Sequence, residues 1–446
     1  MLFGTSGIRG KLDEVNPEFA QELGRCFGTY MRRKKLREVV VGRDTRITSE
    51  MLLKALISGL LSCGIEVLDF GLVPTPVLAH FAREAGVMVT ASHNPESYNG
   101  LKFFREKREL YPKEEREIEN IFEKRAFKAA DWNDVESVKR ENPIPEYIKD
   151  VLNYARREFG FTEVNKKVVL DCGGGVGNLV LPELLLKMGC EVTTLNSHLT
   201  GFFKRPPEPK EENISELCNL VRETKADLGI AQDGDADRIN LVDERGEVVP
   251  EDSVIALLAY HYASEDDVVV TSIDTSFRID EYLSGKKVKV KRVMLGNLHE
   301  GVKKHNAIFA GEPWKHVHVK FGCHIDGFIS SVILLILLKK RGVSTRKLFE
   351  KIENFFIFKE SVSLGRKVSL SAFKRELKKM RDLREIIEIS GVRANFKDNS
   401  WILVRPSGTE RKLRIVVEAR SKKRLNEHLD FLKSAGCLDT TTKLSR

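Results

Sequence analysis

Cysteine is scarce in this sequence, and no two cysteines are closely spaced. There are seven in 446 residues, an odd number, and they include no Cys-x-x-Cys pair. A disulfide framework requires cysteines in pairs, and a cysteine zinc site requires closely spaced ligands, so the pattern argues against both. We expect reduced thiols, as in a cytoplasmic protein, at positions 26, 63, 172, 190, 218, 323 and 437.

Long apolar runs are also missing. The longest mostly apolar run, residues 328–338, is far shorter than the roughly 20 residues that a membrane-spanning helix requires. The chain starts at Met1 and passes almost at once into the glycine-rich stretch 4–10, which is unlike a secretory signal. The sequence therefore predicts a cytoplasmic protein with no membrane partner.

Acidic residues are fewer than basic ones, 65 against 74, which gives a formal net charge of +9. Such an excess is found in proteins that bind nucleic acid, anionic membranes or acidic substrates. The basic residues are scattered, however, and no basic stripe with interleaved aromatic residues occurs. A non-catalytic nucleic-acid-binding protein, whose binding would fall steeply with salt, is the alternative from another class. We expect no nucleic-acid partner, and we assign part of the charge to binding a phosphorylated substrate.

The length predicts three or four domains. Strand-like runs at 39–41, 168–170 and 268–271 each lead into a turn that bears Asp or Gly, and helical patterns follow. This alternation predicts α/β domains with mainly parallel sheets covered on both faces, and the echo between the runs suggests three related units. We place the domains at residues 1–145, 146–248, 249–356 and 357–446.

Local patterns give further expectations. Residues 4–10 resemble a flexible polar start, the charged stretch 105–140 an exposed helix, and residues 371–384 a helix. Arg43 and Arg46 follow the first strand, and surface pairing is the role that we expect for them.

A hydroxyl, an imidazole and an amide lie side by side in Thr90-Ala91-Ser92-His93-Asn94-Pro95. The apolar run before Thr90 predicts a short buried strand, and Asn-Pro and the later Asn-Gly predict turns. Ser92 is therefore expected in a tight loop at a strand end, with Lys102 shortly after it. A serine hydrolase is an alternative, but the chain has no G-x-S-x-G elbow, and neighbouring side chains on an extended backbone point to opposite sides.

Three carboxylates alternate with small residues in Asp233-Gly234-Asp235-Ala236-Asp237-Arg238. This spacing lets three oxygens converge on one hard cation if the backbone curls. A calcium loop also begins D-x-D-x-D, but Arg238 stands where that loop needs glycine, and the flanks are strand-like. A solvated acidic turn is the other alternative. Few carboxylates and an open face suit magnesium shared with a phosphate.

Two glycine-bearing turns could each approach an anion. Arg405-Pro406-Ser407-Gly408-Thr409 follows a predicted strand and offers a guanidinium, two hydroxyls and free backbone N–H groups, although an ordinary turn has the same composition. Residues 171–178 read D-C-G-G-G-V-G-N, an incomplete dinucleotide fingerprint that tight strand-to-helix packing also explains.

Together these motifs resemble those of the α-D-phosphohexomutases, a family of magnesium-dependent phosphosugar mutases. T-A-S-H-N-P at 90–95 and D-G-D-A-D-R at 233–238 carry the resemblance, which extends from residues 3–10 to the Arg405 turn. Within the family, Gly311-Glu312-Pro313 and Asp326-Gly327 are most like archaeal chains described as phosphoglucosamine mutases. The resemblance implies three related α/β domains and a smaller C-terminal α+β domain around a central cleft.

The family likeness also implies roles for single residues. Ser92 would be carried as phosphoserine, near Arg9, and Lys102 or His93 would accept the proton, for which Lys102 needs a lowered pKa. One Mg²⁺ per chain would bind Ser92, Asp233, Asp235 and Asp237. The substrate-binding candidates are Arg238, Glu312, His316, Arg405, Ser407, Gly408 and Thr409.

The implied reaction interconverts a sugar 1-phosphate and a sugar 6-phosphate through a bisphosphate, with a hexose 1,6-bisphosphate as activator. Glucosamine phosphate is the first expectation for the substrate, and mannose, glucose and pentose phosphates are alternatives. The family loop commonly reads G-E-x-S-G-H, whereas Trp314 and Lys315 here replace the serine and glycine, which would reshape the pocket or give an inactive relative. We expect phosphosugars as partners and a monomer or homodimer.

Overall fold

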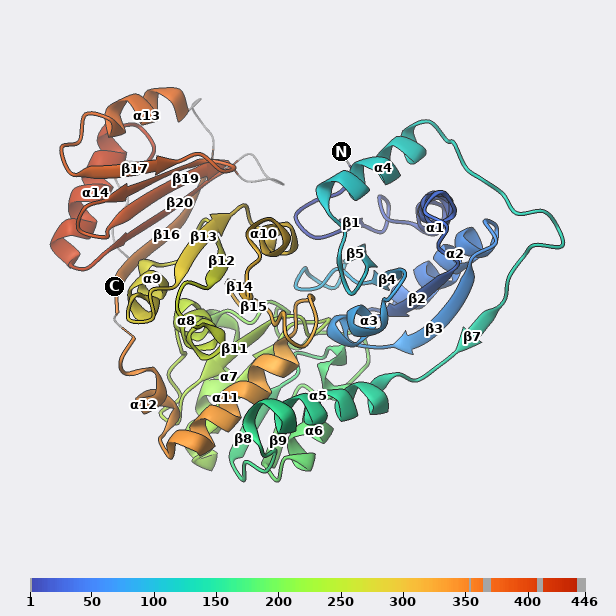
Figure 1. Ribbon diagram of the computed structural model, residues 1–446, viewed down its shortest axis with the longest axis horizontal. Helices are drawn as coiled ribbons and strands as arrows, with labels where there is room; N and C mark the ends of the chain where they lie inside the picture. The colour runs from blue at the N-terminus through green and yellow to red at the C-terminus, as the bar shows by residue number, and fades with distance from the viewer. Residues whose placement is uncertain (1, 353, 364–369, 407–411, 439–446) are drawn as a thin grey trace.

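The computed structural model describes residues 2–352, 354–363, 370–406 and 412–438. Four sheets follow one another along the chain. They lie in an arc, with the first and the fourth sheet at its two ends (Figure 1). In the described parts of the chain, no helix is long and apolar enough to cross a membrane.

The first sheet has the strand order β1-β5-β4-β2-β3-β7, and β6 pairs with β5. Helices cover both faces of this sheet, so each face packs into a hydrophobic core. Val39 and Val41 of β2 lie in one core and Val40 lies in the other. Its strands are β1 (Ile8–Lys11), β2 (Glu38–Arg43), β3 (Glu66–Leu72), β4 (Gly86–Val89), β5 (Tyr98–Arg105), β6 (Arg108–Glu109) and β7 (Val138–Arg140). Its helices are α1 (Pro17–Arg33), α2 (Ser49–Leu61), α3 (Thr75–Phe81) and α4 (Pro112–Glu123).

The second and third sheets have the orders β11-β10-β8-β9 and β13-β12-β14-β15. The second unit contains α5 (Ile144–Phe159), β8 (Lys167–Asp171), η1 (Val176–Leu179), α6 (Leu181–Lys187), β9 (Glu191–Leu195), η2 (Glu211–Asn213), α7 (Ser215–Thr224), β10 (Leu228–Gln232) and β11 (Ile239–Val242). The third contains α8 (Glu251–Tyr262), β12 (Val268–Ser272), α9 (Phe277–Ser284), β13 (Lys289–Val293), α10 (Leu298–His305), β14 (Phe309–Glu312), β15 (Lys315–Val317), α11 (Gly327–Arg341) and α12 (Thr345–Phe349).

These three units share one topology. In each, the first strand (β2, β8 or β12) lies between the second and the third, parallel to both, and the fourth strand is antiparallel to the third. The fourth strands are β5, β11 and β15. The expectation of three related α/β units is therefore confirmed, and their sheets are mixed because the fourth strand of each is antiparallel. The runs at 39–41, 168–170 and 268–271 are the equivalent first strands.

The connection between the third and the fourth strand of each unit contains one non-glycine residue in the left-handed backbone region. These residues are Ser92 (φ 50°), Ala236 (φ 61°) and Trp314 (φ 66°). That conformation costs an ordinary residue roughly 1–2 kcal/mol and persists only where the surroundings hold it. Three predicted functional loops thus occupy one topological position, each with a strained residue.

The fourth unit is a five-stranded antiparallel sheet with two helices, as expected for the α+β domain. It contains β16 (Phe356–Ser363), α13 (Leu370–Leu377), β17 (Leu383–Ile387), β18 (Val392–Phe396), β19 (Trp401–Pro406), β20 (Lys412–Ala419) and α14 (Lys422–Ser434). The buried Arg393 donates to the carbonyls of Ile273 and Thr275, and Glu418 accepts from the N–H of Phe277. These bonds fasten the fourth unit to the third.

Three local expectations differ from the structure. Residues 8–11 form β1, because their backbone pairs with β5 across the sequence and no local pattern reveals that pairing. Within 105–140, only Pro112–Glu123 is helical, and its third residue, Glu114, accepts a hydrogen bond from the N–H of Tyr111, where the helix begins. The helix expected over 371–384 ends at Leu377, and β17 begins six residues later.

Candidate active site

Ser92 lies in the connection between β4 and β5, residues 90–97, which we call the phosphoserine loop. Its side chain is fully buried, and its hydroxyl donates to Asp233 Oδ2 at 2.7 Å. Its backbone N–H donates to Thr90 Oγ1 at 2.8 Å. The structure therefore places the predicted nucleophile directly against the first carboxylate of the predicted metal site, 141 residues away in the chain.

Arg46 holds the phosphoserine loop, which corrects the expectation that it pairs at the surface. It is 1% exposed, and its Nε donates to Asp44 Oδ2 at 3.0 Å. Its two terminal nitrogens donate to four backbone carbonyls of one segment: Ser92 (3.0 Å), Asn94 (2.7 Å), Pro95 (2.6 Å) and Tyr98 (3.0 Å). A planar guanidinium with five donors can satisfy such a set, which a lysine cannot.

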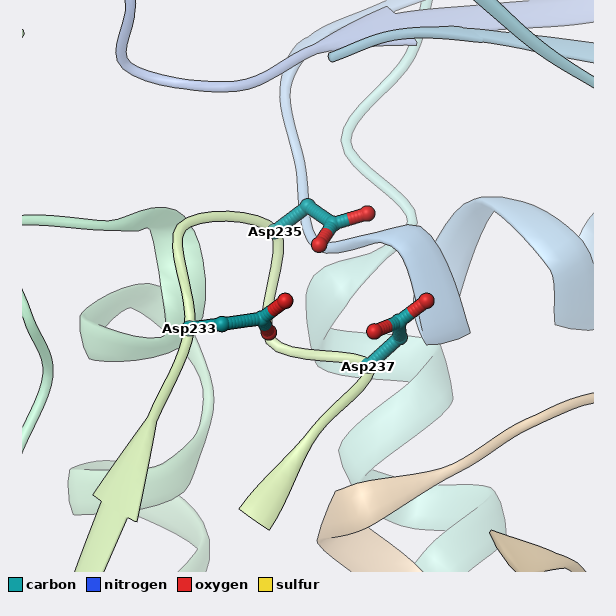
Figure 2. A group of neighbouring side chains, drawn as sticks. All are labelled: Asp233, Asp235 and Asp237. Carbon is teal, nitrogen blue, oxygen red and sulfur yellow. The ribbon is translucent and has the colours of Figure 1, made fainter. Parts of the chain in front are cut away.

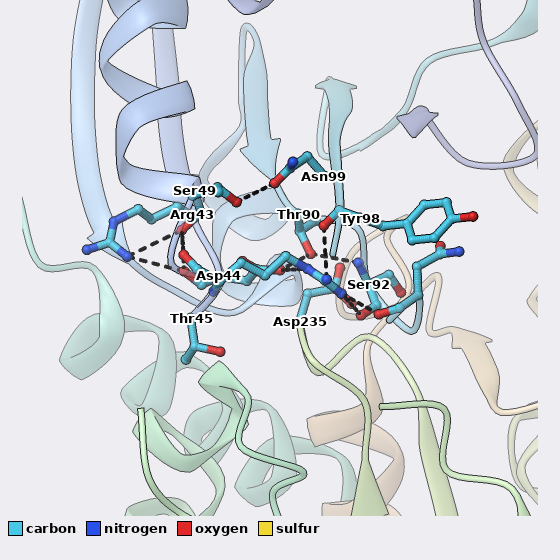
Figure 3. Close-up of polar contacts among 12 residues, drawn as sticks. Arg43, Asp44, Thr45, Ser49, Thr90, Ser92, Tyr98, Asn99 and Asp235 are labelled. Carbon is cyan, nitrogen blue, oxygen red and sulfur yellow. Dashed lines mark hydrogen bonds and ion pairs between the residues drawn. The ribbon is translucent and has the colours of Figure 1, made fainter. Parts of the chain in front are cut away.

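Asp44 connects this arginine to the strand end. Its Oδ2 also accepts from Thr90 Oγ1 at 2.7 Å, so one carboxylate orients both Arg46 and the residue at which β4 leaves the sheet. Figure 3 shows residues of the β2–α2 connection, among them Asp44 and Thr45, beside Thr90, Ser92 and Tyr98. Arg43, in contrast, pairs with the exposed Glu50, as the sequence led us to expect.

The carboxylates of Asp233, Asp235 and Asp237 come together on the loop between β10 and β11, the metal loop (residues 233–238). They are buried and provide one oxygen each within 4.8 Å of one another (Figure 2). Burial, followed by repulsion from the other two carboxylates, raises the pKa of Asp233 to about 8. Asp235 Oδ1 and Asp237 Oδ1 are buried, with no hydrogen-bond partner among the described residues. Carboxylate oxygens that lack partners, in a cluster of three such groups, fit a hard divalent cation.

Lys102 contributes a buried cation to this centre from β5. Its Nζ lies 2.5 Å from Asp235 Oδ2 and 2.6 Å from Asp237 Oδ2. Burial would lower the pKa of Lys102, but attraction by the two carboxylates outweighs it, and the pKa is raised. The lowered pKa that a lysine base needs is therefore not found. This could not be predicted, because the sequence does not reveal how closely the two aspartates approach Lys102.

Arg9 and His93 lie next to each other. Arg9 donates to Asn94 Oδ1 at 2.9 Å and lies 3.3 Å from His93 Nδ1. Burial, helped by the nearby Arg238 and Arg9, lowers the pKa of His93 far below its ordinary value. The imidazole is therefore neutral and has a ring nitrogen free of a proton.

Arg238 is oriented by a residue that the sequence analysis missed. Its guanidinium lies 2.9 Å from Glu208 Oε1, and Asp233 and Trp314 lie farther off, at 3.9 Å and, to the ring centroid, 5.8 Å. Glu208 belongs to the R-P-P-E-P stretch 205–209. Arg205 of the same stretch donates to the buried Asp171 and to the carbonyl of Gln232, the last residue before the metal loop. The sequence signal that could have identified Glu208 was this proline-rich stretch, which contains both an arginine and a glutamate.

The glycine-rich turn 171–178 packs against the metal loop. A Cβ at Gly175 would run into the backbone of Asp233 and Gly234, and one at Gly177 into the Gln232 side chain. The glycines are therefore needed for a close approach between two loops, in addition to the tight packing that we expected.

Residues 311–316, the sugar loop, belong to the hairpin of β14 and β15. Glu312 is buried, and its Oε2 accepts from the N–H of Gly296 at 2.9 Å. Lys315 is 3% exposed, and its Nζ lies 3.3 Å from Asp237 Oδ2. His316 is buried and its Nδ1 lies 2.9 Å from Ser330 Oγ, inside the third unit. The structure thus joins the sugar loop to the metal loop through Lys315, which the sequence analysis treated only as a departure from the family pattern.

Arg405 stands near the end of β19 and is partly buried. Burial lowers its pKa, against the attraction of Asp274 and Glu312. Ser407, Gly408 and Thr409 lie outside the described residues, so the predicted phosphate anchor is described at Arg405 alone.

Comparison with known proteins relates all four units to one family. Models of the phosphoglucomutase/phosphomannomutase alpha/beta/alpha domains I, II and III match residues 1–129, 129–246 and 250–355, and the model of the C-terminal domain matches 368–434. A crystal structure of a phosphoglucomutase/phosphomannomutase family protein from Burkholderia thailandensis has the same fold. It superposes with a TM-score of 0.86 at 24% identity and covers 97% of both chains.

Two curated relatives are similar over nearly the whole chain. A phosphopentomutase from Thermococcus kodakarensis is 45% identical over 446 aligned positions, 97% of each chain. A probable phosphoglucosamine mutase from Pyrococcus abyssi is 37% identical and covers 95% of this chain and 94% of its own.

Proposed function

This chain belongs to the phosphoglucomutase/phosphomannomutase family, and we propose that it transfers a phosphoryl group between two oxygens of one sugar through Ser92. It is a phosphosugar mutase, an enzyme of the isomerase class, from a family that depends on magnesium. The observation that carries our assignment of the nucleophile is the buried Ser92 hydroxyl. It lies 2.7 Å from Asp233, on a strained backbone that Arg46 holds.

Mg²⁺ fits the metal loop, because its three carboxylates are the hard oxygen donors that this ion prefers and two of their oxygens have no other partner in the described chain. One ion per chain would be held by Asp233, Asp235, Asp237 and a phosphate oxygen on Ser92. When bound, it neutralises charge on the transferring phosphoryl group.

The chain's own residues account for the transfer. A sugar hydroxyl attacks the phosphorus of phosphoserine 92, so that a bond forms between phosphorus and the sugar oxygen while the bond between phosphorus and Oγ breaks. The proton of the attacking hydroxyl passes to His93, a neutral imidazole, and the departing Oγ takes up a proton, which restores the hydroxyl that donates to Asp233. Lys102, which is buried, and Arg9, which is partly buried, stabilise charge on the phosphoryl oxygens as cations. The sugar bisphosphate then reorients and returns its other phosphoryl group to Ser92. A free sugar bisphosphate would prime the enzyme in the same way.

Arg405, with Ser407, Gly408 and Thr409, is the proposed anchor for the phosphate that does not react. The anchor and the phosphoserine loop belong to different units, so one phosphate can stay bound at one end while the other reacts. Glu312 interacts electrostatically with Arg405 and with Lys315. Burial lowers the pKa of Arg405, and the charge of Glu312 opposes this shift; burial raises the pKa of Glu312, and the charge of Lys315 opposes that shift. Glu312 and His316 are proposed to border the sugar, and Arg238 to meet its phosphate.

We propose a pentose phosphate as substrate, in place of the glucosamine phosphate that the sequence favoured first. The support is twofold. The phosphopentomutase relative is 45% identical, against 37% for the probable phosphoglucosamine mutase, and two large side chains fill the sugar loop where the family pattern has serine and glycine. Glucosamine phosphate is the second candidate, supported by the Pyrococcus relative.

The test is a substrate panel. The protein is primed with a sugar 1,6- or 1,5-bisphosphate and Mg²⁺, and ribose, deoxyribose, glucosamine, glucose and mannose 1-phosphates are compared by kcat/KM. We expect ribose or deoxyribose 1-phosphate to lead. Preference for a hexose phosphate would overturn the substrate and keep the reaction, whereas turnover of no sugar would overturn both.

We also propose that the enzyme works in the cytoplasm. All seven cysteines are free thiols, and burial raises the pKa of several of them, Cys172 to about 12. Unpaired thiols fit a reducing compartment.

A further inference from the structure

Trp314 and Lys315 replace two small residues of the family loop and stand at the junction of two units. Lys315 is the first residue of β15 and lies opposite Glu312 in the hairpin. The Trp314 carbonyl accepts from the N–H of Ile239, the first residue of β11, at 3.1 Å. The loop of the third unit is therefore fixed against the end of the metal loop, and its two unusual side chains are held there.

Lys315 brings a positive charge from the third unit into the reacting centre. It is 3% exposed, and Asp237, at 3.3 Å, is the one ionic partner of its ammonium among the described residues. An ammonium has three donors. One contact at this distance leaves donors of the ammonium for a bound ligand.

Trp314 provides a second donor without a partner. Its indole Nε1 is buried and has no hydrogen-bond partner in the described part of the chain. Leaving such a donor unsatisfied costs about 1–3 kcal/mol, and an acceptor on a bound ligand would recover it. The guanidinium of Arg238 lies 5.8 Å from the centre of the same ring and holds one side of it.

We propose that Trp314 and Lys315 select the sugar: their bulk excludes a hexose, and the indole N–H and the ammonium bind hydroxyls of a pentose phosphate. This inference rests on the proposed mutase function and substrate. Serine and glycine at these positions would leave the volume that one further CH–OH group of a hexose needs. The two donors give the smaller sugar the hydrogen bonds that its size alone would not provide.

The experiment restores the family loop. Trp314→Ser, Lys315→Gly and the double variant are compared with wild type on ribose 1-phosphate, glucosamine 1-phosphate and glucose 1-phosphate. For the double variant, we expect the ratio of kcat/KM for pentose phosphate over kcat/KM for hexose phosphate to fall by about tenfold or more. Part of this change should be an increase in kcat/KM for hexose phosphate itself. Trp132→Ser, a change at a tryptophan 91% exposed on the first unit, should leave the ratio unchanged.

Lys315→Met separates bulk from charge, since it keeps the side-chain length and removes the ammonium. We expect KM for ribose 1-phosphate to rise while hexose phosphates stay excluded. A KM equal to that of wild type would overturn the hydroxyl contact. If the double variant does not fold, as judged by its circular dichroism, Lys315→Met and Trp314→Ser decide the proposal.

The outcomes distinguish this inference from the proposed function. If wild type turns over pentose phosphates and the restored loop leaves the ratio unchanged, the selector is wrong and the proposed function stands. If wild type prefers a hexose phosphate, the proposed substrate and the selector both fail. Transfer of phosphate from a sugar bisphosphate to Ser92 in each variant shows that the reacting centre is intact.

Discussion

The phosphoserine loop and the sugar loop connect equivalent strands in two related units, but they are held in different ways. Arg46 donates to four backbone carbonyls in and beside the phosphoserine loop, whichever side chains the loop displays. The sugar loop has one backbone bond to the metal-loop side, from the N–H of Ile239 to the Trp314 carbonyl, and is otherwise bound through its own side chains, by Glu312 to Gly296 and by Lys315 to Asp237.

This difference predicts that substitutions act differently in the two loops. A loop fixed by its backbone keeps Ser92 at one position relative to the metal loop. A loop that is fixed through side chains changes both its shape and its contacts when those side chains change. Variants near Ser92 should therefore lower activity on every sugar by the same factor, whereas variants in the sugar loop should change the ratio between sugars.

The largest effect is expected at the metal loop. Asp235→Asn removes one charge of the proposed metal site and a partner of both Thr75 and Lys102, so turnover of all sugar phosphates should be lost at any Mg²⁺ concentration. The measurement is the rate as a function of added Mg²⁺. Asp266→Asn, at an exposed aspartate of the third unit, is the control. A variant with the Mg²⁺ response of wild type would contradict the role of the three carboxylates.

Arg46→Ala should produce the next largest effect. It releases four carbonyls, and a small displacement of a reacting group costs roughly 100-fold in rate, so kcat should fall by about that factor on pentose and hexose phosphates alike. KM should change little, and Arg46→Lys should restore only part of the rate because it cannot reach the same set of acceptors.

Arg43→Ala, at the end of β2, removes a partly buried arginine that pairs with the exposed Glu50 and is the matched control for Arg46. A loss of folded protein with normal kcat per folded molecule would mean that Arg46 only stabilises the domain. A change in the ratio between sugars would break the contrast between the two loops.

Arg405→Ala should weaken binding of the sugar phosphate and leave the rate of phosphoryl transfer nearly unchanged. Loss of one charge-assisted interaction of about 1.5–3 kcal/mol predicts a KM increase of roughly 10- to 150-fold, with a smaller change in kcat. Steady-state kinetics on ribose 1-phosphate give both values, and Arg346→Ala at a surface ion pair is the control. An unaltered KM would argue against the anchor.

How much of this could be predicted from the sequence depended on the range of each interaction. Ser92 and the three aspartates were identified because each belongs to a motif of six consecutive residues, 90–95 and 233–238, in which the chemistry is visible. The three related units were visible because Val39, Val168 and Val268 lie at the first or second position of equivalent strands.

Interactions between distant segments were not visible in the sequence. The carbonyls that Arg46 binds lie 46 to 52 residues further along, and Lys102 meets Asp235 across 133 residues, which reversed the expected pKa shift. Glu208 could not be assigned for the same reason, since it acts through Arg238, 30 residues away.

The smallest effect concerns pH. His318, directly after β15, lies between Tyr262 and Ser330, and burial lowers its pKa to about 3. The unfolded chain takes up a proton near pH 6.5, so the stability from neutral His318 is complete above that pH and declines as the pH falls toward 3. The loss is at most about 1.4 kcal/mol per pH unit.

His318→Gln should flatten the fall of Tm between pH 6.5 and 4, whereas His198→Gln, at an exposed position, should not. Equal slopes in the two variants would contradict this role of His318.

The central claim is that Ser92 carries the phosphoryl group. The direct measurement is peptide mass spectrometry of the protein after incubation with Mg²⁺ and ribose 1,5-bisphosphate or glucose 1,6-bisphosphate, under conditions where it turns over. We predict one phosphate, on the peptide that contains Ser92, and none in Ser92→Ala, which should also be inactive. A protein that turns over sugar phosphates without phosphate on Ser92, or an active Ser92→Ala variant, would contradict the account.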